Sequence, residues 1–93
     1  MVEQAPGDSR VRFMLAMEYI NSQQFADAKR EFDELISRDP TYVSAYFMAG
    51  RACESVGDLA GARGYLELGV ETARRIGDRH AESEMQEALD LMG

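Results

Sequence analysis

Several features that define broad protein classes are missing from this sequence. A single cysteine, Cys53, leaves no partner for an internal disulfide bond. No apolar run approaches the roughly 18 residues that a membrane-spanning helix needs. Residues 1–7 have neither the basic segment nor the apolar segment of a secretory signal. From these absences we expect a cytoplasmic protein.

Positive charge is also scarce. The chain carries 10 Lys and Arg residues against 17 Asp and Glu residues, a formal net charge of -7. Proteins that bind nucleic acids or anionic membranes use Lys and Arg to displace counterions from the phosphates. We therefore expect neither a nucleic acid nor a membrane as a partner.

Apolar residues recur at helical spacing along most of the chain, and no stretch shows the alternation of apolar and polar residues that is typical of a β-strand. The expected fold is all-α, with about five helices bounded by Pro40 and by the pairs Gly57-Asp58 and Gly77-Asp78. Residues 1–8 are expected to form a flexible N-terminal tail before a single domain, 9–93. Expected helix caps are Asp8 or Ser9, Thr41, Asp58 and Asp78. The expected helices run over about Ser9–Ser22, Phe25–Ser37, Tyr42–Val56, Leu59–Ile76 and Arg79–Met92.

A pattern in the first half of the chain recurs after 34 residues. The matched positions are Leu15 with Ala49, Ala16 with Gly50, Tyr19 with Cys53, Ala28 with Ala62, and Phe32 with Leu66. Self-similarity at such a period indicates stacked helical repeats. Small residues at four of these positions would let two antiparallel helices cross closely, with larger side chains filling the space between them. We expect Gly61, Gly64 and Gly69 to be tolerated in the fourth helix for the same reason.

These residues resemble the tetratricopeptide repeat, a 34-residue helix-turn-helix unit with the pattern W-x2-L-G-x2-Y…A-x3-F…P. The first copy reads Arg12-x2-Leu15-Ala16-x2-Tyr19, Ala28-x3-Phe32 and Pro40, and the second reads Tyr46-x2-Ala49-Gly50-x2-Cys53 and Ala62-x3-Leu66. Arg12 departs from the pattern where a large apolar residue is usual, and Arg74 replaces the closing proline of the second copy. The resemblance implies a right-handed superhelical stack with repeat one at about 9–42, repeat two at about 43–77 and a capping helix at about 78–92. It also implies that the motif residues, Leu15 among them, hold the repeat together.

In the family that this chain resembles, the first helix of each repeat lines a concave groove. The resemblance implies a partner-binding groove formed by Arg10, Phe13, Met17, Ile20, Asn21, Ser44, Phe47, Met48, Arg51, Glu54 and Ser55. Some members hold the C-terminal carboxylate of heat-shock chaperones with Lys and Asn, but Phe13 and Met17 stand at the corresponding positions here. The groove should instead bind a peptide or an amphipathic helix through its aromatic and methionine side chains, with Arg10 and Arg51 available for an acidic group.

Two other interpretations of the apolar groove residues remain open. They could be core residues, covered by the fifth helix or by a second subunit. They could equally belong to a homodimeric scaffold, in which the groove is filled by a second copy of the chain. Fewer than three repeats bury a thin core, which favours such self-association. We expect a non-enzymatic interaction module with no cofactor and no small-molecule substrate, because no pair of titratable residues is placed for catalysis.

The remaining candidate sites are explained more simply without a ligand. His80 lies near Asp78 and Glu82, but a surface position is favoured over a metal site, and no metal is expected. Cys53 stands where the repeat has a packed residue, so we expect a buried thiol rather than a nucleophile. The glycines that begin at Gly57 follow no strand, which excludes a phosphate-binding loop. An acidic face on the fifth helix is either a solvated cap or a surface for a basic partner, and it comprises Glu82, Glu84, Glu87 and Asp90.

Overall fold

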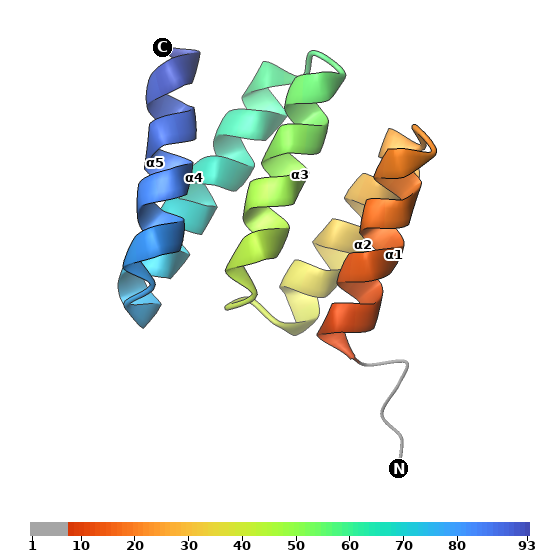
Figure 1. The fold of residues 1–93 in the computed structure, drawn as a ribbon, viewed down its shortest axis with the longest axis horizontal. Coiled ribbons are helices and arrows are strands. Elements are labelled where there is room, and N and C mark those ends of the chain that lie inside the picture. Colours follow the sequence, from red (N-terminus) through yellow and green to blue (C-terminus); the bar gives the residue numbers. More distant parts are fainter. Residues whose placement is uncertain (1–7) are drawn as a thin grey trace.

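The computed structural model describes residues 8–93, and the tail expected at 1–8 lies outside them apart from Asp8. Five helices follow one another in this part of the chain (Figure 1). Each helix begins and ends within one residue of its expected position. All five elements are α-helices, so the all-α prediction is confirmed. None of these helices combines the length and the apolarity needed to span a membrane. The helices are α1 (Ser9–Asn21), α2 (Phe25–Arg38), α3 (Val43–Ser55), α4 (Leu59–Ile76) and α5 (Arg79–Met92).

Aspartate side chains cap three of the helices, as expected. Asp8, Asp58 and Asp78 accept hydrogen bonds from the backbone N–H groups of residues 10, 61 and 81, at 2.8, 2.9 and 3.0 Å. Each bond satisfies a donor that the first helical turn leaves unpaired. Gly57 and Gly77, with φ of 81° and 80°, end α3 and α4 in a left-handed conformation that suits glycine.

The prediction that Thr41 caps α3 is wrong. Tyr42 occupies the N-cap position, and α3 begins without a side-chain cap. The Thr41 hydroxyl instead donates to the carboxylate of Asp39 at 3.3 Å. Thr41 lies one residue before the N-cap, because the turn after Pro40 continues through a bond from the Tyr42 N–H to the Asp39 carbonyl at 3.1 Å.

Each helix packs against the next in an antiparallel stack of two layers. In Figure 1, α1, α3 and α5 form the near layer, and α2 and α4 lie behind them. The first and last helices, α1 and α5, stand at opposite ends of the stack. The layer of α1, α3 and α5 therefore presents one continuous face.

Small residues bring the helices of each pair together. Ala16 and Ala28 are fully buried at the α1–α2 crossing, and Ala62 is fully buried in α4. At the α3–α4 crossing, a Cβ atom added to Gly50 would lie 3.0 Å from Cγ of Leu66. In both helix pairs, the prediction that small residues let the two helices cross closely is confirmed.

The three glycines of α4 differ from one another. A Cβ atom on Gly69 would lie 2.2 Å from Sδ of Met85 and 2.9 Å from Cβ of Tyr46, so α4 depends on glycine there. Gly64 has open space around it, and Gly61 would meet only the carboxylate of its own capping residue, Asp58. The explanation by close helix approach is therefore correct for Gly69 and wrong for the other two.

Leu15, in the middle of α1, departs from the expected pattern. Leu15 is 41% exposed, so the prediction that this motif position helps hold the repeat together is wrong. The reason is positional, because α1 is the first helix of the described stack and packs mainly on α2. Arg12 is tied to α2 by an ion pair of 2.9 Å with Glu31, with each side chain about one-fifth exposed. This contact gives the unusual arginine a role within the first repeat.

Candidate interaction groove

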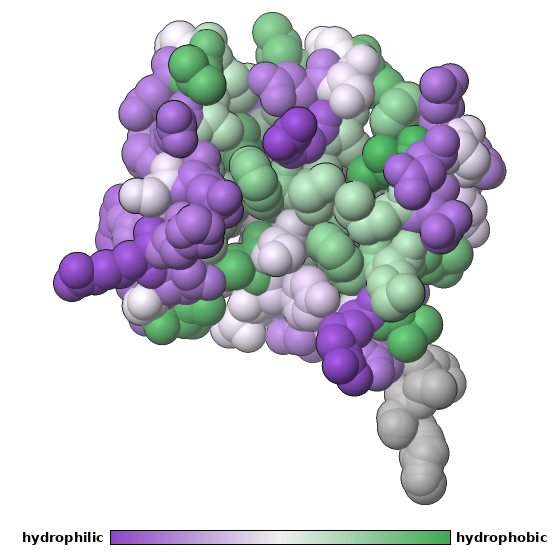
Figure 2. All heavy atoms as spheres, viewed as in Figure 1, coloured by the Kyte–Doolittle hydropathy of each residue, from purple (hydrophilic) through white to green (hydrophobic). Residues whose placement is uncertain are grey.

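The face formed by α1, α3 and α5 carries the residues expected to bind a partner. Figure 2 shows this face, with hydrophobic residues gathered over α1 and α3 and hydrophilic residues over α5. The five apolar residues of the expected groove are all partly buried: Phe13, Met17, Ile20, Phe47 and Met48. Arg10 and Asn21 are exposed on α1, and the exposed residues on α3 are Ser44, Arg51, Glu54 and Ser55.

Phe13 belongs as much to the core as to the surface. Its ring packs edge-to-face against Phe32, with ring centroids 6.1 Å apart, and tilted against Tyr42 at 5.5 Å. Aromatic pairs in these geometries stabilise the fold beyond the area that they bury. Met17, Ile20 and Met48 likewise pack against the buried cluster formed by α1, α2 and α3, while part of their surface stays open.

A pocket of about 280 Å³ opens between α3 and α5. It combines residues of α3 that were expected in the groove with residues of α5 that were not. Glu54, Glu84 and Glu87 supply carboxylates, while Arg51 is the one basic residue of the lining. The full lining is Phe47, Arg51, Glu54, Glu84, Glu87, Ala88 and Leu91.

Arg51 lies over the ring of Phe47, with its guanidinium carbon 5.8 Å from the ring centroid. A guanidinium in this position is attracted by the negative face of the ring. Its own helix also supplies Glu54, which lines the same pocket. The surroundings of Arg51 are thus acidic, although Arg51 was expected to be available for an acidic group of a partner.

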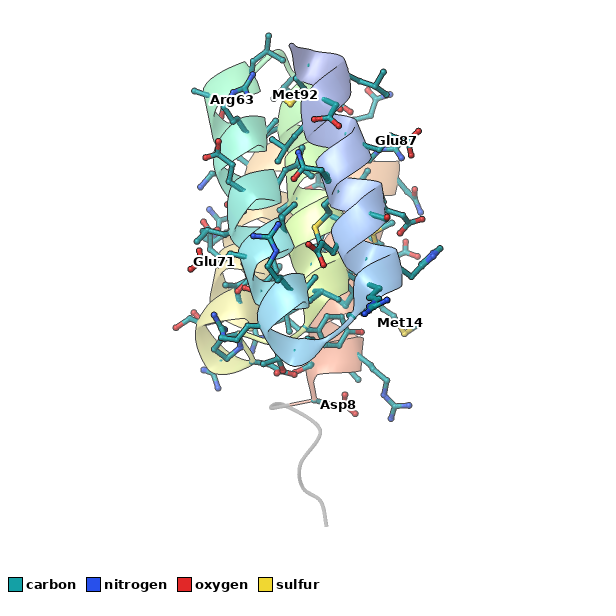
Figure 3. The ribbon with its side chains drawn as sticks, turned by 90° about the vertical axis from the view of Figure 1, so that its left-hand side faces the viewer. Asp8, Met14, Arg63, Glu71, Glu87 and Met92 are labelled. Carbon is teal, nitrogen blue, oxygen red and sulfur yellow. The ribbon has the colours of Figure 1, made fainter. Side chains whose placement is uncertain are left out.

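The acidic face expected on α5 is divided in the structure. Glu82 forms an ion pair of 2.8 Å with Arg74 of α4, and Asp90 accepts a hydrogen bond of 3.1 Å from Gln86. Glu84 and Glu87 line the pocket instead. Figure 3 shows Glu87 on the same side of the molecule as Met14 of α1, and opposite Arg63 and Glu71 of α4. The spacing of Glu84, Glu87 and Leu91 could have predicted these α5 residues in the pocket. Residues three and four positions apart share one side of a helix, and here that side lies next to the buried Met85.

The other chemically reactive residues form no second site. Cys53 is buried as predicted, at 5% exposed, and burial raises the pKa of its thiol, which disfavours the nucleophilic thiolate. His80 has an 85% exposed side chain whose Nε2 lies 3.4 Å from a carboxylate oxygen of Glu84. Within residues 8–93 no group of three or more His, Cys, Asp or Glu side chains is placed to hold a metal ion.

Comparison with known proteins assigns the fold to a family. The family model described as tetratricopeptide repeat matches residues 9–42. A TPR repeat-containing protein of Pseudomonas aeruginosa is 33% identical over 85 residues, which cover 91% of this chain and 81% of that protein. The chain therefore belongs to the tetratricopeptide repeat family, and its five helices are consistent with two repeats plus a capping helix.

Solved structures agree with this assignment. The solution structure of a tetratricopeptide repeat domain protein from Salinibacter ruber superposes with a TM-score of 0.85 at 32% identity, covering 94% of this chain and 87% of that one. The solution structure of a protein from Bordetella parapertussis gives a TM-score of 0.79 at 32% identity, covering 89% of this chain and 72% of that one. Domains of this family are generally protein–protein interaction modules and are typically non-catalytic.

Proposed function

We propose that this protein binds a peptide or an amphipathic helix of a partner protein along the face of α1, α3 and α5. The observation that carries the proposal is the band of partly buried apolar side chains over α1 and α3. The band adjoins the open pocket between α3 and α5. A second observation supports it, since α5 stands at the far end of the stack from α1 and leaves the α1 part of this face uncovered (Figure 1).

The chemistry of these side chains suits a helical or extended ligand. Met17 and Met48 offer flexible, polarisable surfaces that adapt to differently shaped apolar groups. Burying apolar area releases roughly 25 cal/mol per Å², and an amphipathic helix brings apolar anchors at spacings of three and four residues. The ligand that fits this face therefore carries its apolar residues along one side.

The test compares three versions of the protein as bait in a pull-down, followed by titration of the purified partner. The groove variant is Met17→Gln/Met48→Gln, which keeps side-chain length and helix propensity while removing apolar surface. The control is Arg63→Gln/Glu71→Gln, on the opposite side of the molecule (Figure 3). Phe13 is left unchanged, because its packing against Phe32 would mix loss of binding with loss of stability.

The wild type and the control should bind the partner alike, and the groove variant should raise Kd about tenfold, which is about 1.4 kcal/mol. Circular dichroism should show the same helix content in all three, and thermal unfolding should confirm that the groove variant is folded at the assay temperature, because Met17 and Met48 also pack against the buried cluster. Equal affinity of the groove variant and the wild type for the captured partner would exclude this face as the binding site.

A second candidate function is self-association as a structural scaffold. It is favoured by three exposed apolar residues on α1, which are Val11 at 53%, Met14 at 66% and Leu15 at 41%. Neighbouring exposed apolar side chains are often covered by a partner, and the outer side of the first helix has no repeat before it in the described chain. In this candidate a second copy of the chain covers α1.

A further inference from the structure

The pocket between α3 and α5 combines apolar side chains with three carboxylates and one guanidinium. Phe47, Ala88 and Leu91 supply apolar surface, and Leu91 is 83% exposed. Glu54 approaches from α3, whereas Glu84 and Glu87 approach from α5. Carboxylates therefore line both walls of the same groove.

Little positive charge balances these carboxylates. Arg51 lies over the Phe47 ring, and the imidazole of His80 lies near Glu84 at 3.4 Å. Among residues 8–93, no basic side chain forms an ion pair with Glu54 or Glu87. Four acidic residues outside the groove do have such a partner, since Asp27, Asp33, Glu34 and Glu82 each pair with an Arg or Lys. Glu54 and Glu87 therefore line the open groove without a basic partner among the described residues.

The groove continues along the two helices beyond this pocket. A smaller cavity of about 30 Å³ lies next to it and is lined by Val43, Ser44, Phe47, Ala81, Glu84 and Met85. Phe47 and Glu84 line both cavities, so the two cavities adjoin along α3 and α5. A segment that follows the groove would meet apolar surface and carboxylates in turn.

We infer that the α3–α5 groove selects a basic amphipathic segment, with Lys or Arg side chains against Glu54, Glu84 and Glu87 and an apolar side chain over Phe47 and Leu91. This inference rests on the proposed function and names the chemistry of its partner. Complementary charge raises the rate of encounter and rejects partners of the wrong sign. A segment rich in Asp or Glu would be repelled at this groove.

The inference is tested with two synthetic peptides of the same length. Both carry Leu at helical spacing, and the polar positions are all Lys in one and all Glu in the other. Fluorescence anisotropy measures their affinity for the wild type, for Glu84→Gln/Glu87→Gln and for Glu67→Gln/Glu71→Gln. The last variant is the control, because it removes two carboxylates from exposed positions of α4 and changes the net charge equally.

The wild type should bind the Lys peptide at least about tenfold more tightly than the Glu peptide. Glu84→Gln/Glu87→Gln should weaken binding of the Lys peptide roughly fivefold, as expected for two partly exposed ion pairs, and the control should change it less than twofold. Added salt should weaken binding of the Lys peptide to the wild type more than to the groove variant. Equal affinity for the two peptides, or an equal loss in both variants, would overturn the inference.

Failure here can be distinguished from failure of the proposed function. If Met17→Gln/Met48→Gln loses the captured partner while the peptides show no charge preference, the groove binds proteins and the inference is wrong. The opposite result is also informative. If the Met17 and Met48 changes leave binding of the captured partner unaffected while the preference for the Lys peptide depends on Glu84 and Glu87, the α3–α5 groove selects basic segments and the partner does not bind the α1–α3 part of the face.

Discussion

Tyr65 links the second repeat to the first through two charged side chains of α2. Its hydroxyl donates to one carboxylate oxygen of Asp33, and Nζ of Lys29 donates to the other at 2.9 Å. The same Nζ lies 5.7 Å from the centroid of the Tyr65 ring. The bond to Asp33 raises the pKa of Lys29, while burial and the bond to Asp33 raise the pKa of Tyr65 to about 12. The folded state therefore holds both protons more tightly than the unfolded chain does.

This arrangement predicts loss of stability at alkaline pH. A pKa that is higher in the folded state than in the unfolded state stabilises the folded protein. This stabilisation is fully present below the pKa of the unfolded state, about 10 for tyrosine, and is lost as the pH rises through the pKa of the folded state. Tyr65→Phe should cost about 1 kcal/mol at neutral pH, because one partly exposed hydrogen bond to a charged group is removed. It should also reduce the loss of stability between about pH 10 and 12.

Urea unfolding of both proteins at a series of pH values measures this effect. Tyr19→Phe serves as the control, since Tyr19 packs against the buried cluster of α1, α2 and α3 and has no part in the Asp33 link. A variant at Tyr65 whose stability falls as steeply as that of the wild type above about pH 10 would contradict the prediction.

At the scale of the helix, α4 offers a matched pair of glycines. Gly64→Ala should stabilise the protein by up to about 1 kcal/mol, because alanine is the better helix former and nothing lies within 4 Å of the added Cβ. Gly69→Ala should destabilise it by about 1–3 kcal/mol, the usual cost of overpacking. Met85 is flexible and can yield, but Cβ of Tyr46, at 2.9 Å, is held by the backbone of α3.

Thermal unfolding followed by circular dichroism separates the two variants. A rise in Tm for Gly64→Ala together with a fall for Gly69→Ala is the expected result. If both substitutions raise Tm, α4 does not depend on close approach to α3 and α5 at Gly69.

At the scale of the whole molecule, the two ends of the stack differ in polarity. The outer side of α5 presents His80, Ser83, Glu84, Gln86, Glu87 and Asp90, whereas α1 exposes the apolar residues Val11, Met14 and Leu15. Polar terminal helices keep an open repeat stack soluble, and only the α5 end carries one here. The α1 end is consequently the favoured place for a second copy.

Sedimentation equilibrium over a range reaching hundreds of micromolar should show a concentration-dependent dimer. Met14→Gln/Leu15→Gln should shift the protein to monomer by removing the exposed apolar surface, at little cost to stability, since both side chains are already exposed. Leu91→Gln, at the other end of the stack, should dimerise as the wild type does. A wild type that stays monomeric at these concentrations would rule out this scaffold.

Much of the fold could be predicted from the sequence because the relevant signals are local. Helix ends depend on neighbouring residues, such as Gly57 with Asp58 and Gly77 with Asp78, and these were confirmed. The 34-residue recurrence identified the helix pairs, and the small residues Ala16 and Gly50 predicted their close crossing. Each of these features is encoded within a few turns of one helix or one hairpin.

The chemistry of the candidate groove could not be predicted in the same way, because it depends on the distances between helices. Four acidic residues on α5 look alike in the sequence, yet Glu82 pairs with Arg74 of α4, while Glu84 and Glu87 line the pocket between α5 and α3. Packing against Phe32 gives Phe13 a core role, and the end position of α1 leaves Leu15 exposed. Helical periodicity tells which side chains share a side of a helix, but only the packing of one helix on another sets which of them become paired, buried or free.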